Sequence, residues 1–137
     1  MNNSQKLAAI DAVYASLPKL ECQRKCMACC QTFGMTGIEL KRLQAVVGPL
    51  KTRKTRCYTE NPLTFRGVLI GVQEVLHCRT CPMLQGDTCS VYAIRPLVCR
   101  IWGLTERTRC SFGCVPERWL TDEEAYAIAI RVQQLSA

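Results

Sequence analysis

The chain has 137 residues, a formal net charge of +7 and eleven cysteines. Its length predicts one domain, residues 1–137, and no apolar run is long enough to cross a bilayer, which argues against a membrane protein. The N-terminal residues include Lys6 and Asp11 and lack the apolar core of a secretory signal, so we expect a cytoplasmic protein. In a reducing compartment this many cysteines indicate metal or redox chemistry, and their odd number disfavours a complete disulfide framework.

The first predicted element is a helix over residues 4–17. Apolar side chains recur there at helical spacing, with Ser4 as the expected cap and Pro18 marking the end. The expected buried stripe consists of Leu7, Ile10, Tyr14 and Leu17, with Val13 at its edge.

A second helix is predicted to begin at Thr36, which stands three residues before Glu39, the spacing of a capping box. Gly48-Pro49 should end it. Its expected apolar face consists of Leu40, Leu43, Val46 and Val47. Residues 50–62 are basic and polar and are interpreted as a loop, whereas residues 63–77 are rich in Val, Leu and Ile and predict one or two short strands.

In the C-terminal half, residues 85–88 predict a turn, and Arg95-Pro96 is expected to start a short helical turn that carries Cys99. Residues 103–118 are expected to be irregular. A second capping box at Thr121 predicts a last helix, whose apolar stripe is Ala125, Ile128, Val132 and Leu135. The chain is therefore expected to fold as a small, irregular α+β domain with helices at both ends.

The cysteines fall into three groups, and short spacings such as Cys26-x-x-Cys29 and Cys78-x-x-Cys81 allow two sulfurs to reach one metal centre. Thiolates are soft ligands that favour zinc and iron–sulfur clusters. Adjacent side chains tend to point apart, so Cys29 and Cys30 fit the separate irons of a cluster more easily than one tetrahedral zinc. The candidate ligands are Cys22, Cys26, Cys29, Cys30, Cys78, Cys81, Cys89, Cys99, Cys110 and Cys114.

Several of these motifs together resemble the CxxCxxCC (YkgJ-type) cysteine-cluster family, which is described as zinc- or iron-chelating. The resemblance runs from about Cys22 to Trp102 and rests on Cys26-Met-Ala-Cys29-Cys30, Cys81-Pro-Met-Leu, Cys89-Ser-Val-Tyr92 and Arg95-Pro-Leu-Val-Cys99-Arg100. It departs from the family at the front, where three residues separate Cys22 from Cys26 and Met27 stands at a position that is usually Gly. The resemblance implies metal binding and supplies no reaction, so whether the chain is an enzyme stays open.

We expect a protein that holds an iron–sulfur cluster, most simply 4Fe–4S, as an electron-transfer, sensing or cofactor module. One alternative is a zinc-stabilised adaptor that binds a protein partner or nucleic acid through a basic surface, although no nucleic-acid motif is present. Another is a metallochaperone. The densest basic run, Lys51 to Arg56, is expected to be solvated.

Other residues near the cysteines have supporting roles in this interpretation. Arg95 and Arg100 flank Cys99 and are expected to donate to cluster sulfurs or offset thiolate charge, although binding of an anionic substrate is an alternative. Tyr92 and Trp102 should pack over the site. His77 is expected at the surface or behind the ligands, and Cys57 is expected to be a plain exposed thiol.

Overall fold

A computed structural model of the chain describes residues 1–21, 34–61, 66–76, 81–86, 88–110 and 112–137; in residues 57–61 and 66–70 it describes the backbone. Four α-helices, two 3-10 turns and two small antiparallel sheets make up this part of the chain. Helices lie at both ends, which confirms the expected α+β class. No helix among the described residues is both long and apolar enough to cross a bilayer.

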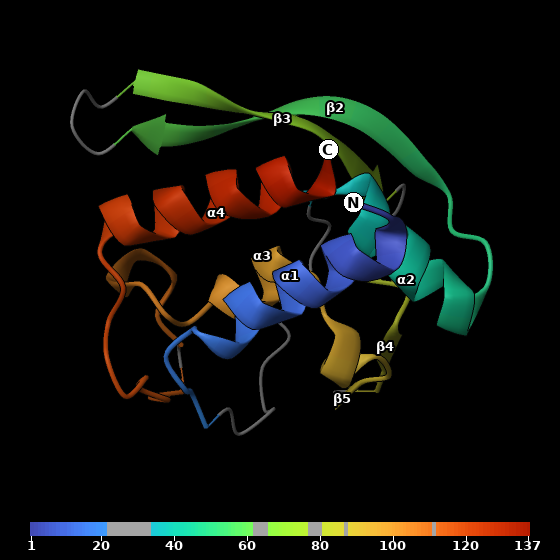
Figure 1. Cartoon of the computed structure of the whole chain (residues 1–137). Coiled ribbons are helices and arrows are strands. Elements are labelled where there is room, and N and C mark those ends of the chain that lie inside the picture. The colour runs from blue at the N-terminus through green and yellow to red at the C-terminus, as the bar shows by residue number, and fades with distance from the viewer. Residues whose placement is uncertain (22–33, 62–65, 77–80, 87, 111) are drawn as a thin grey trace.

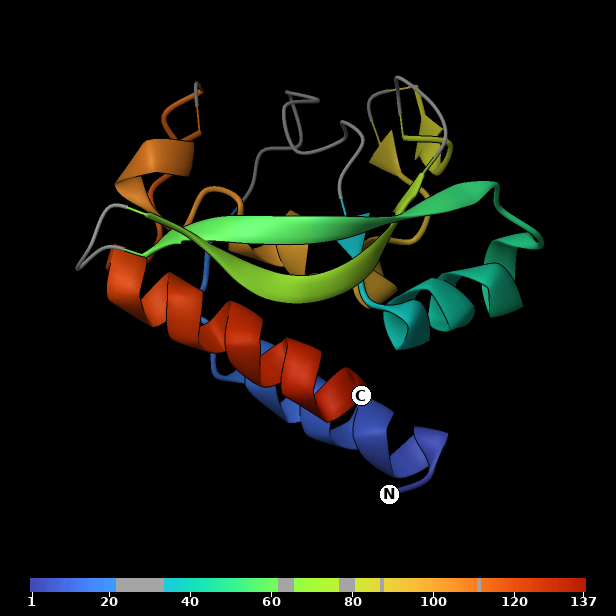
Figure 2. The same ribbon diagram turned by 90° about the horizontal axis from the view of Figure 1, so that it is seen from above.

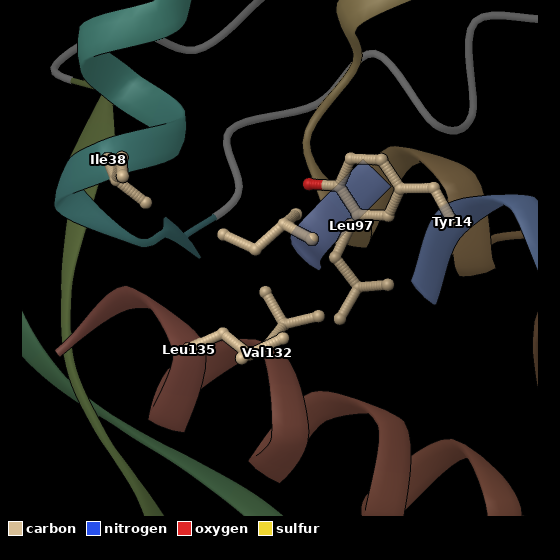
Figure 3. Packing of buried hydrophobic residues seen from close by; sticks show 6 residues of the cluster. Tyr14, Ile38, Leu97, Val132 and Leu135 are labelled. Atoms are coloured by element: carbon tan, nitrogen blue, oxygen red, sulfur yellow. The ribbon is translucent and has the colours of Figure 1, made fainter. Parts of the chain in front are cut away.

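The two terminal helices, α1 (Asn3–Ala15) and α4 (Asp122–Ser136), pack side by side (Figures 1 and 2). They share a cluster with residues of α2 and α3, shown in Figure 3, whose buried members are Ile10, Tyr14, Ile38, Leu97, Val132 and Leu135. Four of these six belong to the predicted stripes of the terminal helices. The chain ends also meet, because Lys6 donates from Nζ to the carbonyl oxygen of Ala137 at 2.5 Å.

The helix ends largely follow the capping signals. Thr36 and Thr121 each accept a hydrogen bond from the backbone N–H three residues later, as predicted. The predicted Ser4 cap is wrong, because α1 begins earlier with Asn2 as its cap, in a capping box with Gln5. Asn is at least as good a cap as Ser, because its side-chain oxygen accepts from the same N–H groups.

Helix α2 (Gly37–Val47) ends at Gly48, which has a φ of 84°, a conformation that glycine adopts without steric cost. Its buried face differs from the prediction. Val46 and Val47 are 66% and 39% exposed, while the buried side chains lie in its first two turns. The last turn therefore lies outside the core, and its two valines are largely or partly exposed.

The larger sheet has the order β1–β3–β2, with β1 (Gly34–Met35) and β2 (Thr52–Asn61) both antiparallel to β3 (Arg66–Leu76). Strand β3 confirms the prediction for residues 63–77. The loop expected over residues 50–62 is wrong, because most of it is the edge strand β2. Edge strands tolerate Lys and Arg because these charges discourage further strand pairing.

Helix α4 lies against the β2–β3 ribbon (Figure 1). A Cβ placed on Gly71 of β3 would stand 2.7 Å from the Gln133 side chain, so glycine permits this close approach. Gln133 also donates to the carbonyl oxygen of Val72 at 3.5 Å. These contacts attach the long ribbon to the helical core.

The short strands β4 (Leu84–Gln85) and β5 (Thr88–Cys89) form a hairpin, which confirms the predicted turn. The 3-10 turn η2 (Tyr92–Ile94) and the five-residue helix α3 (Leu97–Ile101) follow. This region encloses a second apolar cluster, to which Cys81 and Cys89 are partly buried neighbours. Its buried members are Met35, Leu40, Leu43, Leu76, Met83 and Val91.

Candidate metal centre

Helix α3 carries Cys99, one of the predicted metal ligands. As predicted, Pro96 directly precedes this helix. It is the N-cap residue and has an extended conformation, with φ −66° and ψ 166°. The first helical N–H, on Leu97, donates to Oε2 of Glu39 at 2.6 Å. The sulfur-bearing turn is thereby attached to α2, which lies 58 residues earlier in the sequence.

Three predicted ligands from three separate segments line one small cavity: Cys81, just before β4; Cys89, which ends β5; and Cys99, in α3. The cavity has a volume of about 20 Å³. Arg95 also lines it, together with apolar side chains that include Met83 and Val91. All three cysteines are partly buried.

A larger pocket of about 510 Å³ also borders Cys99. Cys99 and Cys110 both line it, as do Arg95 and Arg100. Cys99 and Arg95 therefore line both spaces.

The two arginines are held by backbone carbonyls and aromatic rings. Arg95 donates from Nε to the carbonyl oxygen of Tyr92 at 3.0 Å, and its guanidinium carbon lies 3.7 Å from the centre of the Tyr92 ring. Arg100 donates to the carbonyl oxygens of Arg95 and Ala93 at 2.7 and 2.8 Å. Its guanidinium stacks on Tyr14, 4.2 Å from the ring centre. These contacts fix two positive charges beside Cys99.

Glu39 connects three helices at the base of the site. Its side chain is only 5% exposed and accepts hydrogen bonds from Tyr14 Oη of α1, from the N–H and hydroxyl of Thr36, and from Leu97 of α3. Burial, reinforced by the negative charge of Glu39, raises the pKa of the Tyr14 hydroxyl well above its ordinary value. Tyr14 therefore remains a donor throughout the physiological pH range.

The sequence identified Glu39 only as half of a capping box. One signal for a further role was present, because Glu39 stands four residues before the buried Leu43 and so shares its face of the helix. Its partners Tyr14 and Leu97 are distant in sequence, and no local pattern identifies them.

The remaining predicted residues are distributed more widely. Cys22, Cys26, Cys29, Cys30, Cys78 and His77 lie outside the described residues. Cys57 lies in β2 opposite Gly71, at an irregularity in the strand pairing. Cys114 is buried, at 6% exposure. Within the described part of the chain, no three His, Cys, Asp or Glu side chains are grouped closely enough to hold a metal ion by themselves.

The donor chemistry fits a soft metal. The small cavity is lined by Cys81, Cys89, Cys99 and Arg95, and no carboxylate lines it among the described residues. Thiolates surrounded by apolar side chains suit zinc and iron–sulfur centres far better than magnesium or calcium, which require oxygen ligands. The arginines can donate to sulfur or balance its charge.

The comparisons with known proteins agree with this chemistry. A family model named CxxCxxCC, with the description "Putative zinc- or iron-chelating domain", matches residues 21–128. No curated protein and no solved structure matches the chain. The matched range covers all ten candidate ligands, and it extends beyond Trp102, where the sequence resemblance ended.

Proposed function

The chain belongs to the CxxCxxCC family of zinc- or iron-chelating domains, and we propose that its metal is an iron–sulfur cluster with Cys81, Cys89 and Cys99 among the ligands. The observation that supports this proposal is that these three cysteines, which come from three separate segments, line one cavity. The cysteines between Cys22 and Cys30 would complete the ligand set. Such a cluster supplies one-electron chemistry, at a potential that its ligands and their hydrogen bonds adjust.

Two features favour a cluster over a single zinc ion. Cys29 and Cys30 are adjacent, which suits ligation of different irons better than ligation of one tetrahedral ion. Arg95 and Arg100 stand beside Cys99 without a carboxylate partner among the described residues. Their charges would stabilise an anionic cluster and raise its reduction potential, because net charge near a cluster is one of the factors that set this potential.

The proposal is tested by purification without oxygen, followed by measurement of iron, acid-labile sulfide and zinc in the same sample. An iron–sulfur protein should be brown, contain iron and sulfide in similar amounts, and bleach on exposure to air. Stoichiometric zinc in a colourless protein without sulfide would contradict the cluster and support a thiolate zinc site.

A zinc-stabilised adaptor is the second candidate, because thiolates also bind zinc. This candidate also needs a surface for a partner, and the basic edge strand β2 offers one. Lys51, Arg53, Lys54 and Arg56 are all exposed. A metallochaperone is less favoured because it requires accessible thiolates, whereas the three cysteines at the cavity are partly buried.

Neutralising these four basic residues should affect binding of a partner without affecting the metal site. We expect the combined Gln variant at Lys51, Arg53, Lys54 and Arg56 to keep its full metal content, because none of these residues lines either space beside Cys99. Each exposed charge should change the free energy of unfolding by at most about 0.5 kcal/mol. Elemental analysis and thermal melts measure both properties.

The same variant identifies the class of partner. If the parent protein binds nucleic acid, its affinity should fall steeply with salt, and the variant should show a shallower slope. If it binds an acidic protein surface, the association rate should fall more than the lifetime of the complex. Loss of metal in this variant would show that β2 contributes to the metal site.

A further inference from the structure

The pocket of about 510 Å³ beside Cys99 has the size of a small-molecule site, since such sites span about 300–1,000 Å³. It lies between the end of α1, the segment from Leu17 to Glu21, and α3 with the residues that follow it. Leu17, Pro18, Trp102 and Leu104 give it apolar walls. A few polar groups in a largely apolar pocket are typical of a binding site.

The polar groups of this pocket are mainly cationic. Arg95, Arg100 and Lys19 line it, and Glu21 is the one carboxylate among its described lining residues. Each guanidinium carries five N–H donors. Arg95 and Arg100 each make two hydrogen bonds, all to backbone carbonyl oxygens. Each therefore keeps donors that can reach a ligand.

Placing these two cations together costs free energy. Both guanidinium groups stay protonated, and both line the same pocket, so an anion bound there would be attracted by two positive charges. Thiolates on a metal at Cys99 would supply some negative charge, and the pocket also extends to Lys19 and Leu104, which are not metal ligands.

We propose that this pocket binds a small molecule that carries a carboxylate or phosphate group, with its anion on Arg95 and Arg100 and its apolar part against Trp102 and Leu104. Planar guanidinium groups bind both kinds of oxyanion through paired hydrogen bonds. The ligand would lie directly beside the metal centre. The binding of the ligand is independent of the proposed function, whereas any role of the ligand at the metal centre rests on it.

Calorimetric titration of the metal-loaded protein tests this proposal. The probes are phenyl phosphate and benzoate, with neutral benzyl alcohol as the control for purely apolar binding. At least one anionic probe should bind saturably and benzyl alcohol should not; the stronger of the two indicates whether phosphate or carboxylate is the preferred group. Absence of saturable binding by either anion, or equal binding of benzyl alcohol, would overturn the proposal.

Variants assign the binding to this pocket. Arg100→Gln should weaken the anionic probe about tenfold or more, because a hydrogen bond to a charged group contributes about 1.5–3 kcal/mol. Lys19→Gln, at the exposed rim, should cause a smaller loss. Arg131→Gln changes an exposed arginine of α4 and should cause none. Equal losses in all three variants, or none in the first two, would contradict the assignment.

Metal content, measured on every sample, separates this inference from the proposed function. If the purified protein binds the anion but contains no metal, the anion site is supported and the proposed metal centre is contradicted. If the protein has its full metal content but binds no anion, the metal centre is supported and the anion site is contradicted. If the probe binds only after the metal is removed, the arginines serve the centre alone and the inference is wrong. If Arg100→Gln loses its metal, Lys19→Gln with full metal content decides the test.

Discussion

Replacing Cys99 with Ser is expected to remove most of the bound metal. Cys99 is the one described cysteine that borders both the small cavity and the large pocket, and a serine hydroxyl is a poor ligand for a soft metal. Changing a residue that only supports a ligand typically lowers metal affinity about 10–100-fold. The loss of metal affinity in Cys99→Ser should be larger. Elemental analysis of protein purified without oxygen measures the metal content.

Cys57→Ser is the matched control for this variant. Cys57 lies in β2, and neither the cavity nor the pocket includes it among the described lining residues. Its metal content should equal that of the parent protein. Equal metal content in the two variants would contradict the assignment of Cys99 as a ligand, provided that circular dichroism shows both to be folded.

Glu39→Ala is expected to cause the largest loss of stability among substitutions outside the cysteines. The change leaves the Tyr14 hydroxyl and the N–H groups of Thr36 and Leu97 buried without their acceptor. Each unsatisfied buried group costs about 1–3 kcal/mol, so the free energy of unfolding should fall by about 3 kcal/mol or more. Urea denaturation measures this change.

Glu124→Ala is the matched control, because it removes a capping-box glutamate that lacks the long-range bonds of Glu39. The difference between the two losses of stability measures the contribution of burial and long-range contacts. Glu124 has the same capping-box position in α4, where it accepts from Thr121 N–H at 3.2 Å, but its side chain is 40% exposed and it also accepts from Arg118 at 2.9 Å. Loss of a capping interaction alone typically costs about 1 kcal/mol. Similar losses in the two variants would mean that the bonds to Tyr14 and Leu97 contribute little.

Features set by neighbouring residues could be predicted from the sequence, because their physics is local. The boxes at Thr36 and Thr121, the stop at Gly48 and the turn before Cys99 all depend on contacts within a few residues. Strand β2 was missed for the opposite reason. Its threonines and Tyr58 favour a strand, but the four basic residues suggested solvent, and only pairing with β3 shows that they lie on an edge.

For the candidate metal site, too, local features could be predicted from the sequence and long-range contacts could not. Spacing identified the cysteines as candidate ligands, and the family match supports metal binding. Spacing did not predict that Cys81, Cys89 and Cys99 line one cavity, because their convergence depends on the packing of β4, β5 and α3. The bond between Glu39 and Leu97 joins residues 58 positions apart, and the exposure of Val46 and Val47 depends on where α2 leaves the core.

The division of the apolar residues into two clusters has a consequence for the biogenesis of the protein. The cluster between α1 and α4 contains no cysteine, whereas Cys81 and Cys89 pack against the other cluster. We expect the helical pair to form cooperatively once the whole chain has been synthesised and before any metal is supplied, since regions of one protein can open and close with different free energies. The metal-free protein would then be partly ordered, and its thiols would remain accessible to the machinery that delivers metal.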